Sequence, residues 1–331
     1  MKSQTKFSMS IRPDPDDAEL LFAKQLGIPC AYTWVSPEQT GYEYLVRLRE
    51  RVENAGLTLH NVGSMSVGKS DAIHLALPGR DEKIAEFQQF VRNLGRAGIG
   101  VTTFTWEPDA VWSSPERGET RGASARRVDL AEMVQRPPTH GRAYSREELW
   151  ENFAYFMERI IPVCEEAGVR LALHPNDPPT TESLGGIPCL IHSWETYERA
   201  FEIANSPALG MEFCCGCWLE GGTEGFGDIL AAIRHFVAED RILLVHFRNI
   251  TSPLPVFTET FLDNGYMDMY QIMKTFVETG YSNTMILDHT PRFVEGNASL
   301  RRAGDGVCDR VYAFALLQCA VERAEAELGA D

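Results

Sequence analysis

Apolar and polar residues follow two regular patterns along the chain, one typical of buried strands and the other of amphipathic helices. Short apolar runs rich in β-branched and aromatic residues predict strands that are covered on both faces. Eight such runs are present, at 7–11, 30–34, 57–62, 98–106, 169–174, 209–214, 241–248 and 284–288. Longer segments with helical spacing of apolar residues predict helices at 15–26, 40–55, 81–97, 146–167, 193–204, 227–237, 267–279 and 305–328.

Strict alternation of strands and helices favours a parallel sheet with helical crossovers. The count of eight strands favours a closed (β/α)₈ TIM barrel, which we expect to form one domain over residues 1–331. A long polar segment, roughly 107–145, separates the fourth strand from the fourth helix and contains six arginines between Arg117 and Arg142. Loops of this length are usually either lids over a site or disordered.

Four of the predicted strands end on a residue that can bind a metal ion. These residues are His174, Cys214, His246 and Asp288. In a parallel barrel the C-terminal ends of the strands converge on one mouth, where the active sites of such barrels lie. Two imidazoles, a thiolate and a carboxylate suit a borderline divalent cation, so the pattern predicts a metal-dependent enzyme.

The cysteine-rich segment around Cys214 has other interpretations. The run Cys214-Cys215-Gly216-Cys217 could belong to a structural zinc site, but no second cysteine pair with suitable spacing is present. A redox CxxC motif is also present, although it does not begin a thioredoxin-like unit. Glu212 lies on the same strand face as Cys214 and could be the ligand in its place, or a second ligand.

Two further residues next to the predicted ligands suggest chemistry. Arg248 lies on the same strand face as His246, where a substrate carboxylate could satisfy its charge through two hydrogen bonds. The alternative for Arg248 is a structural ion pair with a glutamate at the barrel rim. His289, which follows Asp288, could donate or accept a proton beside the metal, or could orient a ligand by a hydrogen bond.

The composition excludes several classes of protein. The net charge of −16 disfavours binding to nucleic acid or to anionic membranes. No stretch approaches the roughly 18 apolar residues that span a bilayer, and the N-terminus has no apolar signal-peptide core. No Gly-rich phosphate motif follows any predicted strand. We therefore expect a cytoplasmic enzyme with reduced thiols that acts on a small molecule.

Several motifs together resemble those of the mannonate dehydratase family, almost from end to end. The most specific are LALHPNDPP at 171–179, GMEFCCG at 210–216, VHFRNI at 245–250 and LDH at 287–289, which occur in the family's order and with similar spacing. The resemblance implies a TIM barrel, and a divalent metal such as Mn²⁺, with Mg²⁺, Fe²⁺, Co²⁺ or Zn²⁺ as substitutes. It also implies loss of water from a mannonate-type aldonic acid to give a 2-keto-3-deoxy acid.

The resemblance also implies roles for individual residues. The metal ligands are again His174, Cys214, His246 and Asp288, the set chosen from the strand ends. His289 matches the catalytic histidine, which could move the C2 proton or help the C3 hydroxyl leave, and Arg248 is expected to assist it at the substrate. The expected substrate-binding residues are Arg248, Asn249, Asn176 and Trp106. The 107–145 segment is the expected lid, and a homodimer or higher homo-oligomer is expected.

The chain also departs from the family's pattern. Asn176 stands where the family has a carboxylate, Val67-Gly68-Lys69 replaces a VHE segment, and Cys189 replaces an arginine. The stretch after His289 lacks the family's catalytic tyrosine. A divergent dehydratase with another substrate is therefore one alternative. A metal-dependent sugar isomerase or epimerase, using Glu212 and Glu182, is a second, and a non-catalytic barrel that kept its metal is a third.

Overall fold

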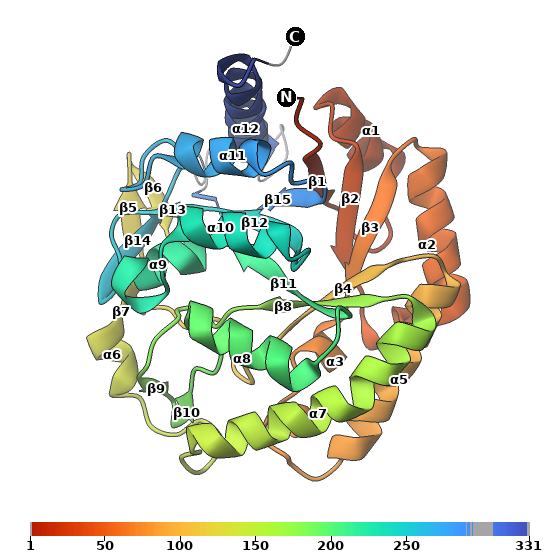
Figure 1. Cartoon of the computed structure of the whole chain (residues 1–331), viewed down its shortest axis with the longest axis vertical. Coiled ribbons are helices and arrows are strands. Elements are labelled where there is room, and N and C mark those ends of the chain that lie inside the picture. The colour runs from red at the N-terminus through yellow and green to blue at the C-terminus, as the bar shows by residue number, and fades with distance from the viewer. Residues whose placement is uncertain (1, 289, 292, 294–306, 330–331) are drawn as a thin grey trace.

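Eight parallel strands close into a barrel in the computed structural model, which describes residues 2–288, 290–291, 293 and 307–329 (Figure 1). The strands are β1 (Lys6–Ser10), β2 (Cys30–Trp34), β3 (Thr58–Gly63), β4 (Val101–Thr105), β8 (Arg170–His174), β11 (Leu209–Cys214), β12 (Ile242–Phe247) and β15 (Thr284–Leu287). The first strand, β1, pairs with both β2 and the last strand, β15, which closes the barrel. The predicted TIM barrel is confirmed, whereas its organisation as a single domain stays a prediction.

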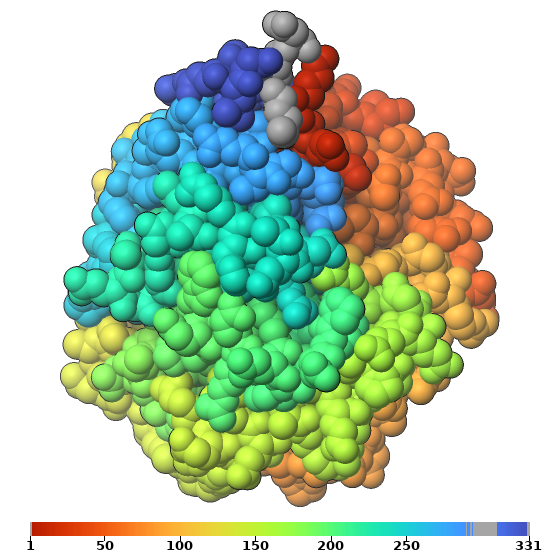
Figure 2. All heavy atoms as spheres, viewed as in Figure 1, coloured from red at the N-terminus to blue at the C-terminus, as the bar shows by residue number. Residues whose placement is uncertain are grey.

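Within the described part of the chain, eight of the helices surround the barrel at the positions that the apolar periodicity predicted. They are α1 (Asp17–Gln25), α2 (Tyr42–Asn54), α5 (Arg80–Arg96), α7 (Arg146–Ala167), α8 (Trp194–Ala204), α10 (Ile229–Ala238), α11 (Met269–Glu278) and α12 (Val307–Glu327). The N-terminal segment and α12 lie at the same end of the molecule (Figure 2), and the Phe7 and Phe314 rings are 6.2 Å apart. Among the described residues, no helix combines the length and apolar character needed to cross a membrane.

Local sequence signals explain where the helices begin and end. At the start of α7, the Ser145 hydroxyl accepts the Glu148 N–H, and the Glu148 carboxylate accepts the Ser145 N–H. The same helix ends at Gly168, whose φ of +65° suits a residue without a side chain. The left-handed turn at Gly168 thus ends α7 just before β8 begins at Arg170.

Strand register brings the ligand-bearing ends together. Cys214 of β11 pairs with His246 of β12, and His246 pairs in turn with Ile286 of β15. On the other side, Thr105 of β4 pairs with His174 of β8. The barrel therefore positions its last four strand ends around one mouth.

The polar segment after β4 is present as expected, but it contains short regular elements. These are β5 (Gly118–Thr120), β6 (Ala123–Ala125), β7 (Arg127–Asp129) and α6 (Leu130–Val134). Strand β7 pairs with β14 (Val256–Thr260), which also pairs with β13 (Asn249–Ile250) in the loop after β12. Two loops that are far apart in sequence thus form one three-stranded sheet.

Candidate active site

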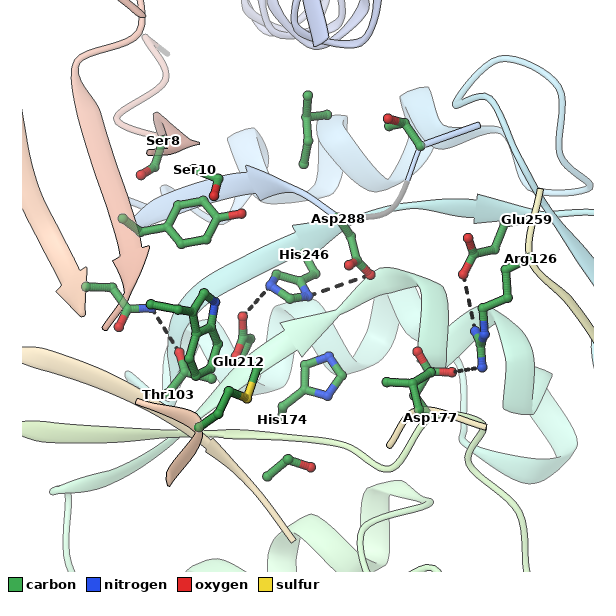
Figure 3. Close-up of a pocket in the computed structure, with 18 of the residues that line it drawn as sticks. Ser8, Ser10, Thr103, Arg126, His174, Asp177, Glu212, His246, Glu259 and Asp288 are labelled. Carbon is green, nitrogen blue, oxygen red and sulfur yellow. Dashed lines mark hydrogen bonds and ion pairs between the residues drawn. The ribbon is translucent and has the colours of Figure 1, made fainter. Parts of the chain in front are cut away.

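A cavity of about 1030 Å³ opens at the C-terminal ends of the strands (Figure 3). Its wall includes His174, Glu212, His246 and Asp288 from the last four barrel strands and their ends. The 107–145 segment contributes Arg126 and several other residues to the same wall. The cavity therefore lies where the strand-end pattern predicted the chemistry.

Three of the four predicted metal ligands form a cluster. Donor atoms of His174, Cys214 and His246 all lie within 4.8 Å of one another. Asp288 is adjacent, with Oδ2 at 3.7 Å from the Cys214 Sγ and 3.6 Å from the His246 Nδ1. Each of the four residues comes from the end of a different barrel strand or from the position just after it.

His174 is oriented by the backbone that follows it. Its Nδ1 lies 2.7 Å from the Pro175 carbonyl oxygen. Because a carbonyl oxygen can only accept, Nδ1 carries the proton in this contact, and Nε2 of the neutral ring keeps its lone pair. Hydrogen bonds of this kind fix the tautomer of metal-binding histidines in proteins.

Cys214 is a buried thiol at the start of α9 (Cys215–Gly225). As the N-cap of that helix, its Sγ accepts the Cys217 N–H at 3.4 Å. Burial acts to raise the pKa of Cys214, but a hydrogen bond with the Cys217 side chain and the charge of Arg248 outweigh it and hold that pKa well below its usual value. A lowered pKa favours the thiolate, which is the form that metals bind.

His246 lies between two carboxylates, as Figure 3 shows. Its Nε2 forms a short ion pair with Glu212 Oε1, and its Nδ1 faces Asp288 Oδ2. Burial acts to lower the pKa of His246, but the charges of Glu212 and Asp288 raise it well above its usual value. Glu212, the alternative ligand, thus contacts the cluster through His246. The Oε2 atom of Glu212 has no hydrogen-bond partner within the described part of the chain.

Arg248 is fully buried beneath the cluster, in contact with four carboxylates. Its nitrogen atoms lie 3.1 Å from Asp177, 2.7 Å from Glu220, 2.8 Å from Glu259 and 2.9 Å from Asp288. Gly216 makes room for it, because a Cβ there would lie 2.3 Å from Arg248 Nε. Of the two interpretations of Arg248, the ion pair with glutamate is thus present, and its catalytic and substrate-binding roles stay predictions.

Arg126 joins the same buried network from the 107–145 segment. It lies 2.6 Å from Asp177, 3.2 Å from Glu259 and 3.4 Å from Glu220. Burial and the charge of Asp177 raise the pKa of Glu220 well above its usual value. Sequence reasoning missed this network because its members come from separate segments that follow different barrel strands, although the six arginines of the 107–145 segment were a visible signal.

The three other predicted substrate-binding residues make contacts within the protein. Asn249 donates to the carbonyl oxygens of Leu262 and Met267, at 3.0 and 2.9 Å. The Trp106 side chain is 2% exposed and packs on the Phe153 ring, with the ring centres 5.1 Å apart. Their roles at the substrate stay predictions, and His289 lies outside the described residues.

Asn176 holds the loop after β8. Its Oδ1 accepts the N–H groups of Leu190 and Ile191 at 2.9 and 2.8 Å, and its Nδ2 donates to the Trp106 carbonyl oxygen at 3.2 Å. Replacing Asn176 with alanine leaves these buried backbone groups without partners. We expect the free energy of unfolding in urea to fall by about 2–4 kcal/mol.

Asn283 provides a matched control for this prediction. Its side chain donates one hydrogen bond, to the Ile242 carbonyl oxygen at 2.9 Å, so Asn283→Ala should cost about 1 kcal/mol. An Asn176→Ala protein with wild-type stability and a raised KM would instead support the substrate-binding role.

The cluster is chemically suited to a divalent metal ion. The His174 ring is fixed through Nδ1, which leaves Nε2 as its donor atom for a metal; the pKa of Cys214 is lowered toward the thiolate form; and Glu212 Oε2 is a buried oxygen without a hydrogen bond among the described residues. Nitrogen, sulfur and oxygen donors together suit borderline cations such as Fe²⁺, Co²⁺ or Zn²⁺, and oxygen donors also suit Mn²⁺. Among the described residues, two other groups of potential ligands lie close together. One contains Asp177, Cys217 and Glu220, all of which contact Arg248.

Comparison with known proteins places the chain in a family. Its sequence matches the family model for D-mannonate dehydratase (UxuA) over residues 25–138 and 125–327. The mannonate dehydratase of Thermotoga maritima is 32% identical over 305 residues, which cover 81% of this chain and 82% of the relative. Both matches include the segments that carry the cluster.

Solved structures agree with the sequence comparison. The mannonate dehydratase of Streptococcus suis serotype 2 matches with a TM-score of 0.85 and 26% identity, over 99% of this chain and 95% of that one. A xylose isomerase domain protein from Planctomyces limnophilus matches with a TM-score of 0.65 at 14% identity, over 98% of this chain and all of that one, which shows the shared fold alone. On the family model, the sequence relative and the closely similar structure, the chain belongs to the mannonate dehydratase family.

Proposed function

We propose that this chain is a metal-dependent hydro-lyase that removes water from a mannonate-type aldonic acid to give a 2-keto-3-deoxy acid. Family membership supports a sugar-acid dehydratase. The observation that carries the proposal is the cluster of His174, Cys214 and His246 on the wall of the barrel mouth and just beneath it. The departures at Asn176, Gly68, Lys69 and Cys189 leave open a substrate other than mannonate itself.

We propose that His174, Cys214, His246 and Asp288 hold the metal ion, with Mn²⁺ first among the candidates and Mg²⁺, Fe²⁺, Co²⁺ and Zn²⁺ as substitutes. When bound, such an ion supplies Lewis-acid stabilisation of the negative charge that develops when a proton is removed next to a carboxylate. Glu212 lies beside this set and holds His246 in place. Arg248 holds Asp288 through Nε at 2.9 Å.

The chain's own groups have the remaining tasks of proton transfer and exclusion of water. A base must remove the C2 proton, and an acid must protonate the departing C3 hydroxyl. His289 is our proposed residue for one of these steps, on the strength of the resemblance. Arg117 and Arg126 of the 107–145 segment line the cavity, which supports a role for this segment as a cover that excludes water from the reaction.

We further propose that the protein works in the cytoplasm as a homodimer or higher homo-oligomer, with a small sugar acid as its partner. The reduced cysteines support this location, since all seven cysteines with described side chains are free. The isomerase or epimerase alternative shares the barrel, but the comparisons do not favour it because likeness at 14% identity extends to the fold alone.

Turnover of a panel of aldonic and uronic acids tests the proposed function. The Mn²⁺-loaded protein should convert at least one six-carbon aldonic acid to a product 18 mass units lighter, roughly the mass of one water, that carries a 2-keto group. Mass spectrometry of the product distinguishes the alternatives, because an isomerase or epimerase conserves mass. A chelator-treated sample is the control, and it should lose this activity and regain it with Mn²⁺. The absence of any dehydrated product across the panel would contradict the proposal.

A further inference from the structure

A buried ion pair lies on the side of the cavity formed by β3 and β4. Lys69 Nζ is 2.8 Å from Glu107 Oε2, and both residues line the cavity. Their side chains are 16% and 7% exposed, so the pair is sheltered but still reaches the cavity wall. Neither residue belongs to the metal-ligand set or to the network around Arg248.

The backbone holds both members of the pair firmly. Lys69 ends the short helix α3 (Met65–Gly68), which lies tightly against β4: a Cβ on Gly68 would lie 3.0 Å from the Thr103 carbonyl oxygen. Glu107 follows Trp106, whose ring is packed in the core. The Oε1 atom of Glu107 accepts the Asp177 N–H at 3.5 Å, and this hydrogen bond connects Glu107 to the loop after β8.

The pair lines the same cavity as the metal cluster. Glu107 is two residues beyond Thr105, which is paired in register with His174. A sugar acid bound at the cluster through its first carbons has the rest of this cavity for its remaining carbons. The β3–β4 side is one wall of the cavity, and Figure 3 shows Thr103 of β4 on it.

The chemistry of the pair suits hydroxyl groups better than a carboxylate. The ammonium group has three donors and the carboxylate is an acceptor, whereas a hydroxyl both donates and accepts. A hydroxyl can therefore bond both partners at once, while a second carboxylate would be repelled by Glu107. The same wall contains Asn61 Oδ1 and Thr105 Oγ1, which have no hydrogen-bond partner in the described part of the chain. Buried polar atoms of this kind are costly unless something pairs with them.

We propose that Lys69 and Glu107 bind the hydroxyl-bearing tail of the sugar acid and so determine which sugar acids the enzyme accepts. This inference rests on the proposed function and adds the location of the specificity-determining residues. The substrate class is an aldonic acid with hydroxyl groups beyond C4, rather than a shorter acid or one with a second carboxylate at the far end.

Substrate length provides the test. Kinetics are compared for a six-carbon aldonic acid, D-mannonate or the best substrate of the panel, and for four-carbon aldonic acids that lack the tail. Lys69→Met should raise KM for the six-carbon acid by about 10- to 100-fold, as expected for losing a hydrogen bond to a charged group. The four-carbon KM and both kcat values should change less than about threefold. Glu107→Gln, which keeps the shape of the side chain, should act in the same direction and provides a second variant if Lys69→Met folds poorly.

A distant ion pair provides the matched control. Lys274 Nζ lies 2.9 Å from Glu327 on the outer surface, so Lys274→Met removes a similar ammonium and should leave both KM values unchanged. An equal rise in KM for both substrate lengths, or no rise for either, would overturn the tail-binding role.

If the wild type turns over neither acid, dissociation constants from calorimetry replace KM. Length-selective loss of binding would then support the subsite while the proposed reaction fails. A wild-type protein that binds neither acid would remove both proposals.

Discussion

Replacing His246 with alanine should remove both the bound metal ion and measurable turnover. His246 is one of three clustered donors, and it contacts both Glu212 and Asp288. Its loss also leaves Glu212 buried without its partner. Because a catalytic metal contributes several kcal/mol to transition-state stabilisation, kcat/KM should fall about a thousandfold or more. Metal content after dialysis against Mn²⁺ and the rate of keto-acid formation are the two measurements.

His235 is the matched control for this variant. It lies in another cluster of potential ligands, 3.0 Å from Glu198 and 3.5 Å from Glu239, but on the outer face of α10. His235→Ala removes the same side chain and should keep wild-type metal content and turnover. If the His246→Ala protein retained stoichiometric metal and wild-type kcat, the proposed metal centre would be wrong.

The barrel could be predicted because its signals are local. Each barrel strand is a buried apolar run, and each of the eight predicted strands overlaps an observed one. The long helices are amphipathic and have recognisable starts and ends, such as the capping box at Ser145 and Glu148. The short strands β7 and β14 carry no such pattern. They form because two loops that are distant in the sequence pair with each other above the barrel. No local feature of either segment predicts that pairing.

The candidate site likewise has a part that the sequence predicts and a part that it does not. The clustering of His174, Cys214 and His246 follows from strand ends and parallel register, both of which can be inferred from the sequence. The contacts of Asn176 and Asn249 do not follow, because an asparagine after a strand can bond either a substrate or a neighbouring loop. In the structure both bond loop backbone, and Arg248 contacts Glu220 of α9 and Glu259 of β14, which lie far apart in the sequence. Such partners are set by the tertiary fold.

Replacing Arg248 with methionine should produce the largest loss of stability among the variants considered. The guanidinium group is fully buried and lies within 3.1 Å of four carboxylates. Its removal leaves Arg126 as the remaining cation in the network, at 3.2 Å from Glu259 and 3.4 Å from Glu220. Removing one partner from a buried ion pair typically costs about 3–5 kcal/mol, and we expect a loss of that size in urea unfolding.

An exposed arginine shows how much of this loss comes from burial. Arg234 lies 3.5 Å from Glu278, with side chains 53% and 33% exposed, so Arg234→Met should cost less than about 1 kcal/mol. A loss below 1 kcal/mol for Arg248→Met would contradict the structural role.

Arg248→Lys then separates stability from substrate binding, because lysine keeps the charge but cannot reach several carboxylates at once. If Arg248 holds Asp288 and the loops together, Arg248→Lys should also be destabilised. If Arg248 binds the substrate instead, the Arg248→Lys protein should be as stable as the wild type and show a raised KM.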